Sequence, residues 1–129
     1  MDNFKVMVVD DEQDFLETII KRLKARKIEV TGAESGQKAL DLIDSQDMDV
    51  MILDVKMPGM DGIETLREVK KRKPLLEVIM LTGHASVESG IQGMQLGAFD
   101  YVMKPVALDE LLEKMRQAYE RKLIQEGKG

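Results

Sequence analysis

The sequence predicts an α/β fold: five βα units that form a doubly wound parallel five-stranded sheet with helices on both faces. Two observations lead to this prediction. Short apolar runs alternate five times with longer segments whose apolar residues recur at helical spacing. The third run, Val50–Leu53, is apolar throughout, as expected of a parallel strand buried on both faces. Such alternation is typical of helices packed over a parallel sheet.

The apolar runs give the expected strands, which are Lys5–Val9, Ile28–Gly32, Val50–Leu53, Val78–Leu81 and Tyr101–Met103. The first helix is predicted from the i, i+3, i+4, i+7 pattern of Leu16, Ile19, Ile20 and Leu23. The second helix follows Ser35, a favourable N-cap residue. Its apolar positions are Ala39, Leu40 and Ile43.

The third helix follows Asp61 and is closed by Pro74, with apolar positions at Ile63, Leu66 and Val69. The fourth is marked by Val87, Ile91 and Met94, and it is expected to end at Gly97, a C-terminal cap. Gly90 and Gly93 inside it each cost about 0.8–1 kcal/mol relative to alanine. Either this helix repacks easily, or these glycines pack closely against a neighbour. The fifth helix carries Leu108, Leu111, Leu112, Met115 and Tyr119.

Composition limits the classes of function. With 129 residues, 33% charged and 43% apolar, the chain is expected to be a soluble globular domain over residues 1–124, followed by a flexible tail or the start of a linker over 125–129. The net charge of −5 argues against nucleic-acid binding. No apolar run reaches the roughly 18 residues of a membrane span. Without cysteines or a signal-peptide core, the expected location is the cytoplasm.

Polar residues follow four of the five strands. The first strand ends in Asp10, Asp11 and Glu12, the third in Asp54, the fourth in Thr82, and the fifth in Lys104-Pro105. The carboxyl ends of parallel strands lie on one edge of a sheet, where open α/β folds bind ligands. These side chains are therefore expected to converge although they are far apart in the sequence.

The three aspartates of this set predict a metal site. Clustered carboxylates repel one another unless a cation or a proton intervenes. An all-oxygen set with few carboxylates suits Mg²⁺ better than a calcium cage. An aspartate can also act as a nucleophile toward phosphorus, and Asp54, at the tip of the central strand, is the natural acceptor. Lys104 and Thr82 are placed to contact the phosphoryl oxygens.

The motifs "VVDDE" (8–12), "ILDVKMPGMDG" (52–62), "LTGHA" (81–85) and "DYVMKP" (100–105) stand in the order and spacing of one family. Over residues 4–123 the chain resembles bacterial two-component response-regulator receiver domains. The resemblance implies a (βα)5 fold with the flavodoxin-like strand order 2-1-3-4-5. It also implies a signalling phosphoacceptor that assists its own phosphorylation and dephosphorylation, rather than an enzyme.

The resemblance implies a role for each site residue. Asp54 accepts the phosphoryl group of a phosphohistidine. Mg²⁺ is bound directly by Asp11, Asp54 and the backbone carbonyl of Lys56, and through water by Asp10. Thr82 shifts to the phosphoryl group, and Lys104 pairs with it. Tyr101 moves inward as an aromatic switch, and the bond before Pro105 is cis.

The resemblance implies partners as well. The phosphoryl donor is a sensor histidine kinase or a phosphotransfer protein of a phosphorelay. The face made by the fourth helix, fifth strand and fifth helix switches, and it then controls an effector domain or target protein, or forms a phosphorylation-dependent homodimer. Neither nucleic acid nor membrane is expected to bind this domain directly.

Several of these residues also have a simpler structural interpretation. Asp10 and Asp11 suit the N-terminus of the first helix through its dipole. Thr82 is also a turn cap, and Tyr101 a packing residue. Lys56 and His84, each two residues past a site residue, are hypothesised to tune the lifetime of the phosphoryl group. The basic run Lys70–Lys73 is interpreted as a solvated helix end.

Two other functions use the same residues. A Mg²⁺-dependent phosphatase with an aspartyl-phosphate intermediate typically carries a second acid two residues after its nucleophile, where this chain has Lys56. A phosphate-independent interaction module usually lacks one of the acids or the lysine, and this chain keeps them all.

Overall fold

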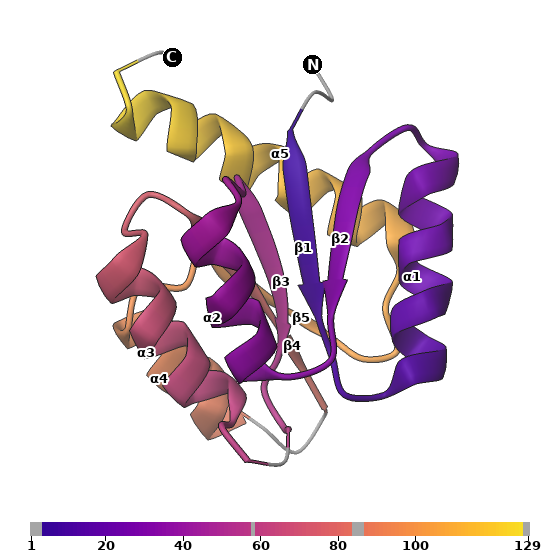
Figure 1. Cartoon of the computed structure of the whole chain (residues 1–129), viewed down its shortest axis with the longest axis horizontal. Helices are drawn as coiled ribbons and strands as arrows, with labels where there is room; N and C mark the ends of the chain where they lie inside the picture. The colour runs from indigo at the N-terminus through magenta and orange to yellow at the C-terminus, as the bar shows by residue number, and fades with distance from the viewer. Residues whose placement is uncertain (1–3, 58, 84–86, 128–129) are drawn as a thin grey trace.

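The computed structural model describes residues 4–57, 59–83 and 87–127. Five strands form one parallel sheet in the order β2-β1-β3-β4-β5, which confirms the predicted fold (Figure 1). The strands are β1 (Lys5–Val9), β2 (Glu29–Ala33), β3 (Val50–Asp54), β4 (Glu77–Thr82) and β5 (Asp100–Met103). The helices are α1 (Gln13–Ala25), α2 (Gly36–Ser45), α3 (Gly62–Arg72), α4 (Val87–Gln95) and α5 (Leu108–Gln125). Among these helices, none has the length and apolarity that a membrane span requires.

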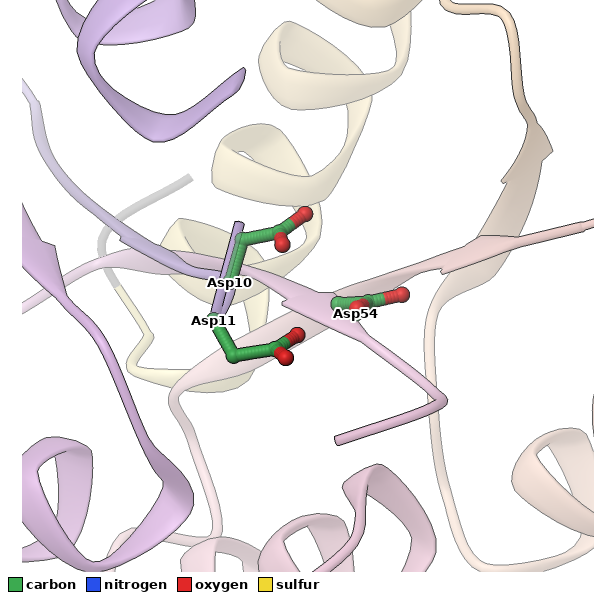
Figure 2. Close-up of side chains that lie close together, drawn as sticks. All are labelled: Asp10, Asp11 and Asp54. Carbon is green, nitrogen blue, oxygen red and sulfur yellow. The ribbon is translucent and has the colours of Figure 1, made fainter. Parts of the chain in front are cut away.

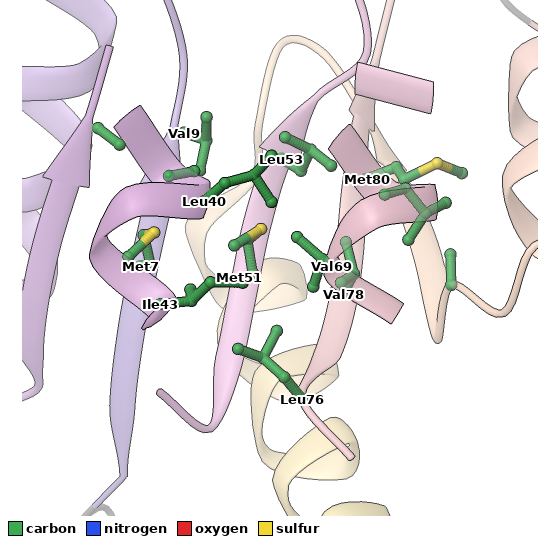
Figure 3. Close-up of a cluster of buried hydrophobic side chains, with 14 of the residues drawn as sticks. Met7, Val9, Leu40, Ile43, Met51, Leu53, Val69, Leu76, Val78 and Met80 are labelled. Carbon is green, nitrogen blue, oxygen red and sulfur yellow. The ribbon is translucent and has the colours of Figure 1, made fainter. Parts of the chain in front are cut away.

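Alternate residues of the strands point into two separate cores. One core lies between the sheet and α2 and α3, and Figure 3 shows Met7, Met51 and Met80 of the strands there, in one cluster with Leu40 of α2 and Val69 of α3. The other core joins the sheet to α1 and α5, and its strand residues include Val6, Val8, Ile52 and Ile79. Because β1, β3 and β4 are buried on both faces, their apolar residues give no alternating pattern in the sequence.

The N-cap predicted at Ser35 is confirmed, and Asp61, which precedes the third predicted helix, caps α3 in the same way. The Ser35 hydroxyl accepts a hydrogen bond from the Lys38 N–H, and the Asp61 carboxylate accepts one from the Glu64 N–H. Each bond satisfies an amide that the first turn of a helix leaves without a partner. After α4, Gly97 has a φ of 103°, as expected of a C-terminal cap.

Strand β2 lies one residue later than the apolar run predicted. Lys27 has a φ of 63°, and the Ile28 N–H donates to the Leu23 carbonyl, so Ile28 belongs to the turn that closes α1. Ala33 joins the strand instead and lies opposite Val9.

Strand β4 begins at a buried charge that the apolar pattern does not indicate. Glu77 is fully buried, and its carboxylate lies 3.0 Å from the Arg121 Nε and 3.6 Å from the Lys70 Nζ. Lys70 also donates to the carbonyls of Pro74 and Leu76. The interpretation of Lys70 as a solvated residue was therefore wrong, because its ammonium group compensates a carboxylate removed from water.

The apolar pattern of α4 faces outward in part. Ile91 and Met94 are 56% and 42% exposed. At Gly93, by contrast, a Cβ atom would lie 2.1 Å from the Met80 Cε, so this glycine allows close approach of α4 to β4. At Gly90 a Cβ atom would meet only the Tyr101 ring, at 3.8 Å. Close packing against Met80 thus explains the glycine at position 93. The glycine at position 90 also lowers the helix propensity of α4, but no close contact requires it.

These contacts predict opposite effects for two similar substitutions. Gly90→Ala is expected to raise the free energy of unfolding by about 0.5–1 kcal/mol, because alanine favours the helix and fits there. Gly93→Ala is expected to lower it by about 1 kcal/mol or more, since Met80 must leave its position. Urea unfolding of both variants checks this, and equal changes of the same sign would contradict it.

Candidate functional site

Three carboxylates meet at the carboxyl edge of the sheet. Asp10 follows β1 and Asp54 ends β3, and these strands are neighbours. The Asp10, Asp11 and Asp54 side chains lie close together and extend to the same side (Figure 2), and one oxygen of each lies within 4.8 Å of the others. Asp10 is fully buried, Asp54 is 6% exposed, and Asp11 is exposed to solvent. The prediction that residues far apart in sequence converge here is confirmed for this cluster.

Local backbone contacts hold the two buried carboxylates in place. The Asp10 N–H donates to the Ala33 carbonyl at 3.1 Å, which continues the pairing of β1 with β2 beyond Val9. The Asp10 carboxylate accepts from the Glu12 N–H at 2.9 Å. Asp54 is paired with Leu81 of β4 as the last residue of the central strand. Both side chains therefore project from rigid strand ends and not from loops.

The environment of these carboxylates disfavours their charged forms. Burial raises the pKa of Asp54 from 3.8 to about 6, and the nearby charge of Asp10 contributes to this rise. Burial also raises the pKa of Asp10. Lys104 opposes both shifts without cancelling them. The Lys104 ammonium group thus does not fully compensate the burial of these two carboxylates.

Lys104 enters the cluster from the end of β5. Its Nζ lies 3.1 Å from Asp10, 3.4 Å from Glu12 and 3.5 Å from Asp54. The same Nζ lies 4.8 Å from the centre of the Phe15 ring, in a cation–π contact. Burial by itself would lower the pKa of Lys104, but the carboxylates of Asp10, Asp54 and Glu12 together raise it. The lysine is therefore held as a cation beside Asp54.

The backbone next to Lys104 is fixed by β4. The Lys104 N–H donates to the Thr82 carbonyl at 2.8 Å, and the Lys104–Pro105 peptide bond is cis. Thr82 is 1% exposed, and its hydroxyl donates to the Met103 thioether. The structure thus places Thr82 and Lys104 on adjacent strand ends.

Two further predicted residues lie at the margin. Tyr101 is 43% exposed, beside α4. Lys56 is exposed, next to a cavity of about 720 Å³ that Asp61 and Arg67 also line. His84 lies outside the described residues, so its predicted role has no structural description here.

Two contacts of Lys104 are absent from the sequence prediction. Glu12 was noted only as part of an acidic strand end, and Phe15 precedes the apolar pattern of α1 without belonging to it. A signal for Glu12 existed, since it lies two residues after Asp10. No sequence signal indicates Phe15, because its contact depends on how the fold brings the Lys104 side chain over the start of α1.

The donor set fits a hard divalent cation. All three side chains offer carboxylate oxygens, and among the residues that the structure describes no other type of ligand joins the cluster. Burial raises the pKa of Asp10 and of Asp54, and a bound cation would compensate the charge of these two carboxylates. Asp11 faces solvent, which leaves an approach for a hydrated ion such as Mg²⁺.

Comparisons with known proteins agree on one family. Residues 6–116 match the response regulator receiver domain. The response regulator MprA of Mycolicibacterium vanbaalenii is 38% identical over 125 residues, which are 97% of this chain and 54% of that protein. The DNA-binding transcriptional regulator NtrC of Klebsiella pneumoniae is 35% identical over 111 residues, 86% of this chain and 24% of that protein. The chain thus spans about half the length of the first relative and a quarter of the second.

Solved structures match over nearly the whole chain. A response regulator receiver domain protein from Clostridium thermocellum has a TM-score of 0.90 and 37% identity, covering 95% of this chain and 98% of that one. The receiver domain of NtrX from Brucella abortus has a TM-score of 0.85 and 32% identity, covering 89% and 98%.

Proposed function

Because the chain belongs to the response regulator receiver domain family of two-component signalling, we propose that Asp54 is its phosphoacceptor and that Mg²⁺ supports the transfer. The observation that carries the proposal is the cluster of Asp10, Asp11 and Asp54 with the Lys104 ammonium 3.5 Å from Asp54. One cation and a metal-ligating set beside a strand-end carboxylate suit the transfer of a dianionic group. The donor is a histidine kinase or a phosphotransfer protein.

In the transfer, an Asp54 oxygen attacks the phosphorus of the donor's phosphohistidine, and the phosphorus–nitrogen bond breaks as the imidazole leaves. Lys104 lies beside Asp54 and supplies positive charge to the phosphoryl oxygens. The Thr82 hydroxyl, on the adjacent strand end, donates a hydrogen bond to another of these oxygens. Asp54 must be ionised to attack, so positive charge near it favours the reactive form.

The chain's own oxygens form the proposed Mg²⁺ site. Asp11, Asp54 and the Lys56 carbonyl would hold the ion directly, and Asp10 would contribute through water. When bound, Mg²⁺ supplies charge neutralisation to the carboxylates and to the incoming phosphoryl oxygens. The exposed Lys56 side chain, together with His84, is proposed to tune how long the phosphoryl group persists.

The proposed output is a change at the face made by α4, β5 and α5. Ile91, Met94, Tyr101 and Met103 are exposed apolar residues of α4 and β5. Tyr101 moves inward when Thr82 shifts to the phosphoryl group, and the face then binds or releases an effector domain or a target protein. A phosphorylation-dependent homodimer is one form that this contact takes.

Incubation with acetyl phosphate and Mg²⁺ tests the proposal. Intact-protein mass spectrometry is expected to show a gain of one phosphoryl group, about 80 Da. The gain is expected to disappear in EDTA and in Asp54→Ala. A matched control is Asp47→Ala, because Asp47 is exposed and the described residues give it neither a hydrogen bond nor an ion pair. A gain of equal size in Asp54→Ala would refute the assignment.

A measurement of released phosphate distinguishes the phosphoacceptor from the alternative of a phosphatase. Steady release of phosphate from diverse phosphate esters, many turnovers per chain, would favour a phosphatase. We expect turnover limited to hydrolysis of the protein's own acyl phosphate.

A further inference from the structure

The Thr82 hydroxyl is engaged by a neighbour that the phosphoacceptor chemistry does not include. It donates a hydrogen bond to the Met103 Sδ, with a distance of 3.1 Å between the two heavy atoms. Within the part of the chain that the structure describes, this is the one hydrogen bond found for that hydroxyl. A threonine hydroxyl has a single proton, so it serves one acceptor at a time.

The contact follows from the pairing of β4 with β5. Thr82 lies directly opposite Met103 in the parallel ladder, so the two side chains stand on the same face of the sheet. Thr82 is 1% exposed, whereas Met103 is 40% exposed. The buried hydroxyl therefore reaches the thioether of a partly exposed neighbour in place of water.

The two acceptors available to Thr82 differ in strength. A thioether sulfur is a weak acceptor, whereas a phosphoryl oxygen is charged and forms a stronger, charge-assisted bond. Transfer of the hydroxyl from Met103 to the phosphoryl group is therefore favourable, and its cost is the loss of the weaker bond.

Met103 has space to move when the hydroxyl leaves. Its side chain lines a groove of about 460 Å³ between α4 and β5, together with Ile91, Met94 and Tyr101. Methionine is unbranched and adapts its shape readily. A change of the Met103 rotamer would therefore alter the packing of the apolar residues of α4 and β5 that line this groove.

We propose that Met103 is a positioning residue that holds the Thr82 hydroxyl in the unphosphorylated protein and releases it to the phosphoryl group. The inference rests on the proposed function, in which Thr82 contacts the phosphoryl oxygens. In this arrangement the thioether opposes activation, and its displacement links the site to the groove between α4 and β5.

The test measures the concentration of beryllofluoride, a phosphoryl mimic, that half-saturates the domain in the presence of Mg²⁺. Met103→Leu keeps the side-chain size and removes the acceptor, so half-saturation is expected at a concentration roughly two- to fivefold lower than in the unsubstituted protein. Met48→Leu is the control for a methionine-to-leucine exchange, since Met48 lies in the core between the sheet and α2 and α3, does not line this groove, and makes no hydrogen bond with Thr82 among the described residues. It is expected to leave the value unchanged.

A second background tests whether the effect passes through the hydroxyl. In Thr82→Val, which lacks the proton, Met103→Leu is expected to have no further effect. An effect of Met103→Leu that persists in Thr82→Val, or that equals the effect of Met48→Leu, would overturn the inference.

A spectroscopic readout keeps the test decisive if Thr82→Val folds poorly. With methyl-¹³C methionine, the Met103 signal is identified by its loss in Met103→Leu, and it is expected to shift when beryllofluoride binds. An unmoved Met103 signal would overturn the inference.

The acetyl phosphate experiment distinguishes failure of this inference from failure of the proposed function. If Asp54 gains a phosphoryl group while the Met103 results are negative, only the role of Met103 is refuted. If Asp54 gains no phosphoryl group, the proposed function itself is refuted.

Discussion

In the absence of divalent cations, Asp54→Asn is expected to raise the free energy of unfolding at neutral pH by about 1–3 kcal/mol. The substitution keeps the shape of the side chain and removes a charge that is buried beside Asp10. Burial and that neighbouring charge raise the pKa of Asp54 from 3.8 to about 6. Lys104 retains Asp10 and Glu12 as partners in the variant, so no buried cation is left unpaired.

The sign and the pH window follow from proton linkage. The folded protein holds the Asp54 proton more tightly than the unfolded chain does, so folding is favoured where both states are protonated. As pH rises from 3.8 to about 6, the unfolded chain releases this proton first, and the wild type loses stability relative to Asp54→Asn. Above that window the difference is expected to be constant.

Urea unfolding in EDTA at a series of pH values measures this difference. Asp47→Asn, at an exposed position, is the control and should change little. Added Mg²⁺ is expected to narrow the gap, because it binds the folded wild type more tightly than the variant. A gap that widens as the pH falls, or a less stable Asp54→Asn, would show that the site tolerates the Asp54 charge without penalty.

Gly62→Ala is expected to lower the free energy of unfolding by about 2 kcal/mol or more, and to slow phosphorylation of Asp54 roughly tenfold or more. A Cβ atom on Gly62 would lie 2.4 Å from the Asp54 carbonyl oxygen and 2.6 Å from the Val55 Cα. Both are backbone atoms, which cannot rotate away. The Gly62 N–H also donates to the Val55 carbonyl at 2.9 Å, so the first turn of α3 is bonded to the segment after β3.

Relief of this clash must displace either α3 or the end of β3, and the second displacement moves the Asp54 carboxylate away from Lys104. Gly83→Ala is the control for stability, because no described atom lies within 4 Å of a Cβ at that position. Urea unfolding and the rate of mass gain with acetyl phosphate give the two readouts. A Gly62→Ala variant as stable and as reactive as the wild type would show that the contact with β3 is not required.

Much of the fold and of the site could be predicted because the determining interactions are local or follow from strand direction. Ser35 and Asp61 act on amides three residues away, so their caps are readable from neighbouring letters. Asp10 and Asp54 meet because parallel strands carry their carboxyl ends to one edge, and knowing that each follows a strand is enough to place them.

The sequence by itself therefore determined the five βα units, the caps of α2 and α3, and the edge at which the carboxylates gather. Only the tertiary structure decided that Glu77 is buried between Lys70 and Arg121. It also decided that Gly62 lies against the backbone of Asp54 and Val55, and that Gly93 lies against Met80. The hydrogen bond from Thr82 to Met103 is likewise a tertiary contact. These contacts join helices and strands that are far apart in the sequence, and the hydrophobic periodicity of the sequence does not indicate which residues meet. Their energies come from desolvation and close packing, which depend on every neighbour in space and not on the adjacent residues of the chain.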